Sequence, residues 1–300
     1  MWFKNLKIYR LASDFRFDAD DLEQQLAKQG YQPIGSRDMQ SLGWVEPRAG
    51  FGLVYSQDGQ ALLCLRQAKK LLPASVINRA ARERAGEIEE QQGFKPGRRQ
   101  MREIKEQLTE EMLPKAFHTE KDVRIWIDTT NRWLVIDTAS NPCADDVLGM
   151  LAKSIDPFPV RPLHVANAPA GAMTAWLYDD EAPEIFTIDQ DTELASTTAS
   201  GAKVRYVRQS LAPEDAQRLI QSGKQCTRLA MTWADRVSFV LSGQLDLRRV
   251  AALDVLREGQ GADQNDDERF ASDFVLMAGE LGRLLADLVD ALGGERKTEG

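Results

Sequence analysis

The chain has 300 residues, of which 43% are hydrophobic and 28% are charged, and its formal net charge is −8. This length and composition predict a sizeable core, organised as two or three subdomains of one protein. No apolar run approaches the roughly 18 residues of a membrane-spanning helix, and the N-terminal stretch is too polar for a signal peptide. We therefore expect a cytoplasmic protein with no membrane partner.

The few cysteines and histidines narrow the possible chemistry. Cys64, Cys143 and Cys226 are far apart in the sequence, which fits neither a disulfide framework nor a zinc site. His118 and His164 are the only histidines, and structural roles are favoured for both. We therefore expect neither a metal nor another cofactor.

Charge is segregated along the chain. Residues 66–105 hold eleven basic residues against five acidic ones, and residues 201–236 hold seven against three. Residues 179–193 contain seven acidic residues and no basic one, and residues 254–295 are also strongly acidic. Exposed charges further apart than about 10 Å are largely screened, so the local charge decides where a polyanion binds. The net negative charge is therefore compatible with a basic binding surface.

The N-terminal part is predicted to begin with a strand over residues 1–11, followed by a helix over residues 19–29. An apolar run over residues 60–66 then leads to the basic pair Lys69 and Lys70. Here the chain is expected to leave the body of the protein and enter a helical finger.

The finger consists of two helical patterns on either side of a Gly-Phe-Lys-Pro-Gly turn. In the second pattern Met101, Ile104 and Leu108 recur at helical spacing, which predicts one buried face. The basic residues at the turn and behind it are Lys95, Arg98, Arg99, Arg102 and Lys105. Two interpretations are open at this point: a positive tip that contacts the DNA backbone, or a solvated hairpin of mixed charge. The chain is expected to return to the body at residues 113–114, where proline ends the helix.

Two later segments alternate like β-hairpins. Residues 122–140 have a turn near residues 130–132, and a helix is predicted to follow over residues 144–154. Residues 227–243 have a comparable turn, and a helix candidate follows over residues 247–256. This recurrence suggests an internal repeat of hairpin and helix.

The region between the two hairpins is mostly polar. Residues 179–200 are expected to form a solvated acidic loop with a short strand near residues 185–188. In the next segment Lys203 and Arg205 alternate with apolar residues, which predicts a strand with both cations on one face. The alternation breaks before Arg208, so a bulge or the end of the strand is expected there.

The C-terminal region is predicted to be a long amphipathic helix from residue 270 to residue 292, ended by two glycines. The apolar stripe along this helix either covers the core of its own chain or pairs with the same stripe of a second chain. Dimer contacts are expected at Phe274, Met277, Leu281, Leu284 and Leu288.

No nucleotide-binding, serine-hydrolase or metalloprotease motif occurs in the sequence. The best enzymatic candidate is a Mg²⁺ nuclease centre that combines Asp128 and Asp137 with Glu110 or Glu111. Both aspartates stand at predicted strand ends, where aspartate often stabilises a turn, so a protein without catalytic activity is favoured. No motif for reading bases is present either. Any DNA binding would therefore depend on backbone charge and weaken steeply with salt.

Several longer motifs carry a resemblance over essentially the whole chain. They are WFKNLKIYRL, GSRDMQSLGWVEP, KLLP, LPKAF, WIDT, DFVLMAGEL and LGGE, in this order. Together they closely resemble the RdgC family of bacterial recombination-associated proteins. The resemblance implies a non-enzymatic α+β protein that forms a head-to-head, tail-to-tail homodimeric ring. It also implies binding of double-stranded and single-stranded DNA with little sequence preference, association with the nucleoid, and restraint of RecA-promoted recombination by occupation of DNA.

The resemblance also suggests roles for individual residues. Lys95 stands where family members carry basic residues at the finger tip, and Phe117 matches an aromatic residue at a subunit contact. Arg208 and Gln209 match a basic residue and a glutamine near the DNA channel. This chain differs in that Gly93, Pro96 and Gly97 interrupt its finger.

The combined prediction is an α+β ring-forming homodimer with mixed sheets, hairpin and helix units, a protruding helical finger and a long C-terminal helix. Residues 1–74 and 115–165 are assigned to a central region, residues 75–114 to the finger, and residues 166–300 to a C-terminal region with the dimerising helix. The expected DNA contacts are Lys95, Arg98, Arg99, Arg102, Lys105, Lys203, Arg205, Arg208 and Gln209. The alternatives are a structural module that binds other proteins through its helical hairpin, and the Mg²⁺ nuclease.

Overall fold

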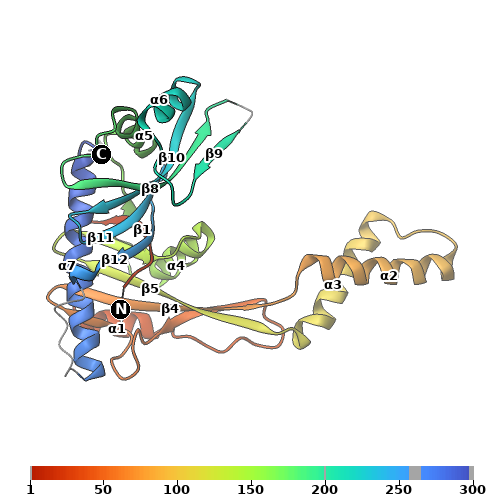
Figure 1. Ribbon diagram of the computed structural model, residues 1–300. Coiled ribbons are helices and arrows are strands. Elements are labelled where there is room, and N and C mark those ends of the chain that lie inside the picture. The colour runs from red at the N-terminus through yellow and green to blue at the C-terminus, as the bar shows by residue number, and fades with distance from the viewer. Residues whose placement is uncertain (1, 199–200, 257–264, 297–300) are drawn as a thin grey trace.

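The computed structural model describes residues 2–198, 201–256 and 265–296. The fold is mixed α+β, as predicted, and it is built on one twelve-stranded sheet (Figure 1). The main strand order is β2-β4-β5-β6-β1-β12-β11-β10-β8-β9, while β3 pairs with β4 and β7 pairs with β1. The pairings are antiparallel throughout.

The strands are β1 (Asn5–Leu11), β2 (Gln40–Val45), β3 (Tyr55–Gln57), β4 (Gln60–Lys70), β5 (His118–Asp128), β6 (Trp133–Asp137), β7 (Val160–Pro162), β8 (Phe186–Ser196), β9 (Lys203–Tyr206), β10 (Lys224–Trp233), β11 (Val237–Ser242) and β12 (Leu247–Ala252). The helices are α1 (Ala19–Ala27), α2 (Ala74–Gln92), α3 (Arg98–Met112), α4 (Asn141–Ser154), α5 (Pro169–Asp179), α6 (Pro213–Gln221) and α7 (Asp266–Ala291), with short 3₁₀ turns η1 (Leu113–Lys115) and η2 (Asp254–Leu256).

Helix α7 lies along one face of the sheet and forms the larger hydrophobic core with it (Figure 1). Asn265 and Glu268 form a capping box at its start, and Gly293 follows its end with a φ of 84°. The buried Glu280 accepts two hydrogen bonds from Arg236, and Asp287 accepts one from the indole of Trp233 at 2.7 Å. These contacts fix the position of α7 against the turn between β10 and β11.

The opposite face of the sheet is covered over only part of its width. Helices α1 and α4 pack on the N-terminal strands and close the second hydrophobic core. Helix α5 contributes Met173 and Leu177 to the α7 core instead. No helix of the described residues packs on the second face of strands β8 to β12. We call this open surface the arm-side face, because the arm and the finger project toward it (Figure 1).

Strands β4 and β5 pair continuously from Gln60 with Asp128 to Lys70 with His118. The arm consists of the outer halves of these two strands, which end at Lys70 and His118. Strand β2 adds a third strand along part of this ribbon. At its outer end the backbone N–H of Leu71 donates to the carbonyl of Phe117 at 2.7 Å, which joins the two chain segments where they enter and leave the finger. The expected finger helices are confirmed as α2 and α3, and they project far from the body (Figure 1).

The first predicted hairpin is confirmed by β5, β6 and the following helix α4. The second is confirmed as β10 and β11, but the helix expected over residues 247–256 is wrong, because strand β12 and turn η2 occupy this segment. A β-bulge explains the error. Between the pairs Ser238–Ala251 and Val240–Arg248, one residue of β11, Phe239, lies opposite two of β12, Arg249 and Val250, so β12 carries one extra residue, at Arg249. This bulge gives the buried Leu247 and Val250 a spacing of three, which imitates a helix.

Strand β8 is also longer than expected, since it continues to Ser196. Its outer part carries Asp189, Asp191 and Glu193 at every second position, and these side chains face the open arm-side surface rather than a core. The sequence therefore lacks the apolar alternation of a covered strand there. Helices α5 and α6 were not predicted. The internal repeat also loses its basis, because only the first hairpin precedes a helix.

None of the helices within the described ranges combines the length and the apolar character needed to cross a membrane.

Candidate nucleic-acid interface

The finger cations lie on a thin, weakly packed element. Helices α2 and α3 share only a small core of Ala81, Ile104 and Leu108, and Met101 packs against it, which confirms the predicted inward face. The basic residues Lys95, Arg98, Arg99 and Arg102 are exposed, and Lys105 is half-buried. Arg99 and Arg102 each bind a glutamate one helical turn later, at 3.0 and 3.3 Å. Exposed pairs of this kind are weak, so both arginines are able to exchange the glutamate for a phosphate.

The second group of cations lies on the arm-side face of the body. Its centre is strand β8, whose carboxylates bind basic residues from the neighbouring strands. We call this group the basic sheet face. Its cations are Lys203, Arg205, Arg208, Arg228, Arg248 and Arg249.

Glu193 organises one part of the basic sheet face. In the strand register it lies between Arg228 on β10 and Arg205 on β9, so the three side chains share one face. Its carboxylate accepts a hydrogen bond from the hydroxyl of Thr227 at 2.9 Å and lies 3.6 Å from the ammonium of Lys203. Burial opposes ionisation of Glu193, but the hydroxyl and the cations outweigh it and lower the pKa of this carboxyl.

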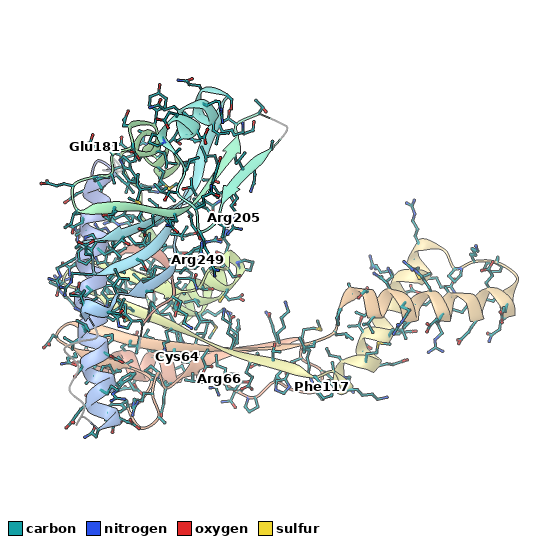
Figure 2. All side chains as sticks on the ribbon, viewed as in Figure 1. Cys64, Arg66, Phe117, Glu181, Arg205 and Arg249 are labelled. Carbon is teal, nitrogen blue, oxygen red and sulfur yellow. The ribbon has the colours of Figure 1, made fainter. Side chains whose placement is uncertain are left out.

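Asp191 organises a second part. One carboxylate oxygen accepts the backbone N–H of Arg208 at 2.7 Å, and the other accepts a guanidinium N–H of Arg249, also at 2.7 Å. The Arg208 amide and the Arg249 guanidinium lower the pKa of Asp191. The side chain of Arg249 remains 59% exposed, so most of its donors are free for another partner. Figure 2 shows Arg205 and Arg249 on the side of the body toward which the arm extends.

Asp246 holds a third set of cations at the edge next to β1. It binds the buried ammonium of Lys7 at 2.6 Å, and the guanidinium of Arg248 approaches it to 3.7 Å. Lys7 also donates to the side chain of Asn141 at the start of α4. Arg248 is thereby placed beside Arg249 along β12, although its side chain is largely covered.

This arrangement fits a polyanion and offers no obvious base readout. The basic residues of this face outnumber the carboxylates that bind them, so the surface keeps an excess of positive charge although Lys203, Arg228, Arg248 and Arg249 are each held by a carboxylate. Anchored guanidinium groups bind phosphate with less loss of side-chain entropy than free ones. Sequence-independent contacts to a nucleic-acid backbone require this kind of surface.

The structure brings together some of the predicted DNA contacts and separates others. Lys203 and Arg205 share a face of β9, as predicted, and Arg208 and Gln209 follow the end of that strand, where Arg208 has a φ of 54°. The finger cations form a separate group, because α3 and the turn between α2 and α3 carry them, and both helices project away from the body (Figure 1). Arg228, Arg248 and Arg249 were not predicted. The alternating carboxylates of β8 were the available signal, because carboxylates at every second position of a strand lie on one face and need basic neighbours there.

The apolar stripe of α7 has a different role from the dimer contact predicted for it. Phe274, Met277, Leu281, Leu284 and Leu288 are at most 1% exposed, since the sheet of the same chain covers them. The stripe therefore covers its own core, which was the other interpretation of the sequence, and it has no free area for a partner. Phe117, by contrast, is 85% exposed at the outer end of the arm (Figure 2), and its role as a subunit contact stays a prediction.

The carboxylates of the nuclease alternative have structural hydrogen bonds. Asp128 accepts the backbone N–H groups of Thr130 and Asn131 and so stabilises the β5–β6 turn. Asp137 accepts the N–H groups of Lys4 and Asn5, and its burial raises the pKa of its carboxyl. Asp128 lies opposite Trp133, the first residue of β6, whereas Asp137 is the last, about 13 Å further along the strand. Within the described residues, no three side chains of metal-binding type gather in one place.

Comparison with known proteins gives matches over the whole chain. Residues 1–295 match a family model described as "Putative exonuclease, RdgC". A protein of Bordetella parapertussis named "Recombination-associated protein RdgC" is 59% identical over 298 residues, which cover 99% of this chain and 100% of the relative. Proteins of the same name from Burkholderia ambifaria and Herminiimonas arsenicoxydans are each 56% identical over 297 residues, and these cover 97% and 99% of the relatives.

Proposed function

The chain belongs to the RdgC family of recombination-associated proteins, and on this premise we propose that it binds DNA without sequence specificity. The observation that carries the proposal is the basic sheet face, where carboxylates of β8 hold basic residues from β9, β10 and β12 in exposed positions. The exposed cations of the finger supply a second contact on the same side of the molecule (Figure 1). Both surfaces fit the phosphate backbone of DNA, whatever its sequence.

The proposed assembly is a homodimeric ring that encircles duplex DNA. In such a ring the basic sheet faces and the fingers of two chains surround the duplex, and the acidic α7 side faces outward. Enclosure slows dissociation without many base contacts, which suits a protein of net negative charge. Occupation of DNA by the ring, at the nucleoid, would restrain RecA-promoted recombination by excluding RecA, without a direct contact to it.

Binding to a short labelled duplex, measured over a range of salt concentrations, tests the DNA contact. We expect the logarithm of the association constant to fall linearly with the logarithm of the salt concentration, because phosphate contacts release counterions. Replacement of Lys95, Arg98, Arg99 and Arg102 by Glu should weaken binding at least tenfold and reduce the slope. Arg269→Glu on α7, on the other side of the sheet, is the control and should have little effect. Unchanged affinity of the finger variant at moderate salt would refute the role of the finger.

Retention on closed and open DNA tests the ring. We expect the protein to stay on circular duplex after a challenge with high salt and to leave linear duplex through its ends. Single-stranded DNA should bind as well, since backbone charge dominates. Equal release from circular and linear molecules would count against encirclement.

Two other functions have some support. The family description names an exonuclease, which predicts loss of linear duplex with Mg²⁺. We propose instead that the protein is not an enzyme, and expect end-labelled duplex to remain intact after long incubation. A cavity of about 440 Å³ at the base of the finger, lined by Ile77, Lys105 and Thr109 among others, supports a module for protein partners. That function alone would leave the protein without salt-dependent affinity for DNA.

A further inference from the structure

Two arginines of the basic sheet face have an unusual backbone conformation. Arg208 has a φ of 54° and Arg249 a φ of 52°, values in the left-handed region that residues with a side chain seldom adopt. This conformation is strained and persists only where the surroundings hold the residue in place. The two positions belong to different strands and are 41 residues apart in the sequence. The left-handed conformation therefore has either one cause that is common to both positions or a separate cause at each.

The separate causes are local and easily identified. Arg249 is the extra residue of the β12 bulge, which turns its side chain out of the regular ladder. Arg208 lies just after β9, where the strand ends and the chain turns. Neither feature explains why two unrelated irregularities carry arginine at the left-handed position.

Asp191 connects the two positions. Its two carboxylate oxygens are divided between them: one binds the backbone N–H of Arg208, and the other binds the guanidinium of Arg249. The carboxylate is itself mostly covered, with a side-chain exposure of 18%, so it is a fixed point on the sheet. Removing it would leave the Arg208 turn and the Arg249 side chain without their anchor.

We propose that Asp191 is a positioning residue that holds Arg208 and Arg249 as a pair for neighbouring phosphates of one nucleic-acid strand. This inference rests on the proposed function, since it assigns a particular subsite of the DNA-binding surface. A carboxylate next to DNA would ordinarily weaken binding by repulsion. Here its effect through the two arginines outweighs its own charge, because the anchored guanidinium of Arg249 loses less entropy when it binds phosphate and the backbone of Arg208 is held in place.

The sign of a single substitution separates positioning from charge. Asp191→Ala removes one negative charge, so electrostatics alone predicts tighter binding of a duplex. Positioning predicts weaker binding, by about five- to tenfold at moderate salt, and a salt slope reduced by about one to two phosphate contacts. The probe is a short labelled duplex, bound by the full-length protein.

Asp189→Ala is the matched control. Asp189 lies on the same strand, and its carboxylate accepts a hydrogen bond from the hydroxyl of Thr232 on the same face of the sheet. Its removal changes the charge equally without releasing an arginine, so affinity should stay constant or increase. A cycle with Arg249→Ala adds a second readout: the effect of Asp191→Ala should shrink in that background, because its main route of action is gone.

Asp191→Asn is a second variant in case Asp191→Ala fails to fold, because asparagine keeps the shape of the side chain and one hydrogen-bond acceptor. Thermal unfolding checks that each variant is folded. Weaker binding with a lower salt slope in folded Asp191→Ala or Asp191→Asn supports the inference. Unchanged or tighter binding overturns it while leaving the proposed function intact. Absence of duplex binding by the unchanged protein would overturn both.

Discussion

At the scale of single residues, the carboxylates of β8 have the clearest structural effect. Glu193 and Asp191 each bind groups from two other segments, and hydrogen bonds and nearby cations lower the pKa of both. A lowered pKa means that the folded state binds a proton less tightly than the unfolded chain does. Their contribution to the free energy of unfolding is therefore present above the ordinary carboxyl pKa and is lost as the pH falls through the lower, folded value.

This linkage predicts an acid-dependent loss of stability. Between pH 7 and about pH 5 the contribution of the two carboxylates should be constant, and below about pH 4 it should decline. At pH 7 the double variant Asp191→Asn with Glu193→Gln should have a lower Tm than the unchanged protein. On acidification its Tm should fall by less. Thermal unfolding followed by circular dichroism between pH 7 and pH 3 measures both. Parallel curves for the two proteins would contradict the assignment.

The cysteines give a second prediction at this scale. All three are buried and unpaired by disulfides, and burial raises the pKa of Cys64 and Cys226 to about 12. The thiolate is the reactive form, so these two thiols should be nearly inert at pH 8 in the folded protein. A thiol reagent followed by absorbance should react slowly in buffer and quickly in concentrated urea. Rapid reaction of either residue in the folded protein would be inconsistent with this burial.

At the scale of elements, α7 and the finger differ in how they are stabilised. Helix α7 has a complete cap and a long apolar face, and it closes the core of the body. The finger helices have no side-chain cap at their first turns and share only a small core. The finger should therefore open locally at a lower free energy than α7.

The role of α7 is tested by Leu281→Ala. Because Leu281 is fully buried, its truncation should reduce the free energy of unfolding by about 2 to 5 kcal/mol. The oligomeric state of the protein that remains folded should not change, since the residue contacts only its own chain. Chemical denaturation and light scattering measure the two effects. Val275→Ala, at an exposed position of the same helix, is the control and should alter neither.

At the scale of the whole molecule, the arm sets the distance between the finger and the body. Strands β4 and β5 carry the finger far from the body (Figure 1), and Phe117 and Leu71 are exposed side by side where the arm ends. Two exposed apolar residues at a projecting end are suited to a subunit contact rather than to DNA. We therefore expect any subunit contact to lie on the arm rather than on α7, whose apolar face is buried against its own sheet.

Phe117→Ala tests this contact. We expect the variant to shift from dimer to monomer at micromolar concentration, with an unchanged Tm, since a residue that is 85% exposed adds little to the fold. Size-exclusion chromatography with light scattering measures the mass. Retention on circular duplex should decrease in the variant along with the fraction of dimer. Val275→Ala again serves as the control, because it truncates another exposed apolar side chain, on α7. A dimer that persists in Phe117→Ala would assign the contact to another surface.

The sequence by itself determined the features that depend on local spacing. The helical periods of the finger, the first hairpin with its turn, and the amphipathic pattern of α7 were each readable, because neighbours within one element set them. The segregated charge also pointed to Lys203 and Arg205. Together with the order of the motifs along the chain and the family resemblance, these local patterns led to the prediction of a DNA-binding protein.

Only the tertiary structure decided which surfaces face one another. Asp191 and Arg249 are 58 residues apart and meet through strand pairing and a bulge, neither of which has a local sequence signal. The same bulge made β12 resemble a helix. The stripe of α7 fits a core or a dimer equally well in sequence, because burial against one's own sheet and burial against a partner require the same apolar spacing. Packing of α7 on strands that are distant in the sequence buries the stripe against its own sheet, and the local pattern does not encode this packing.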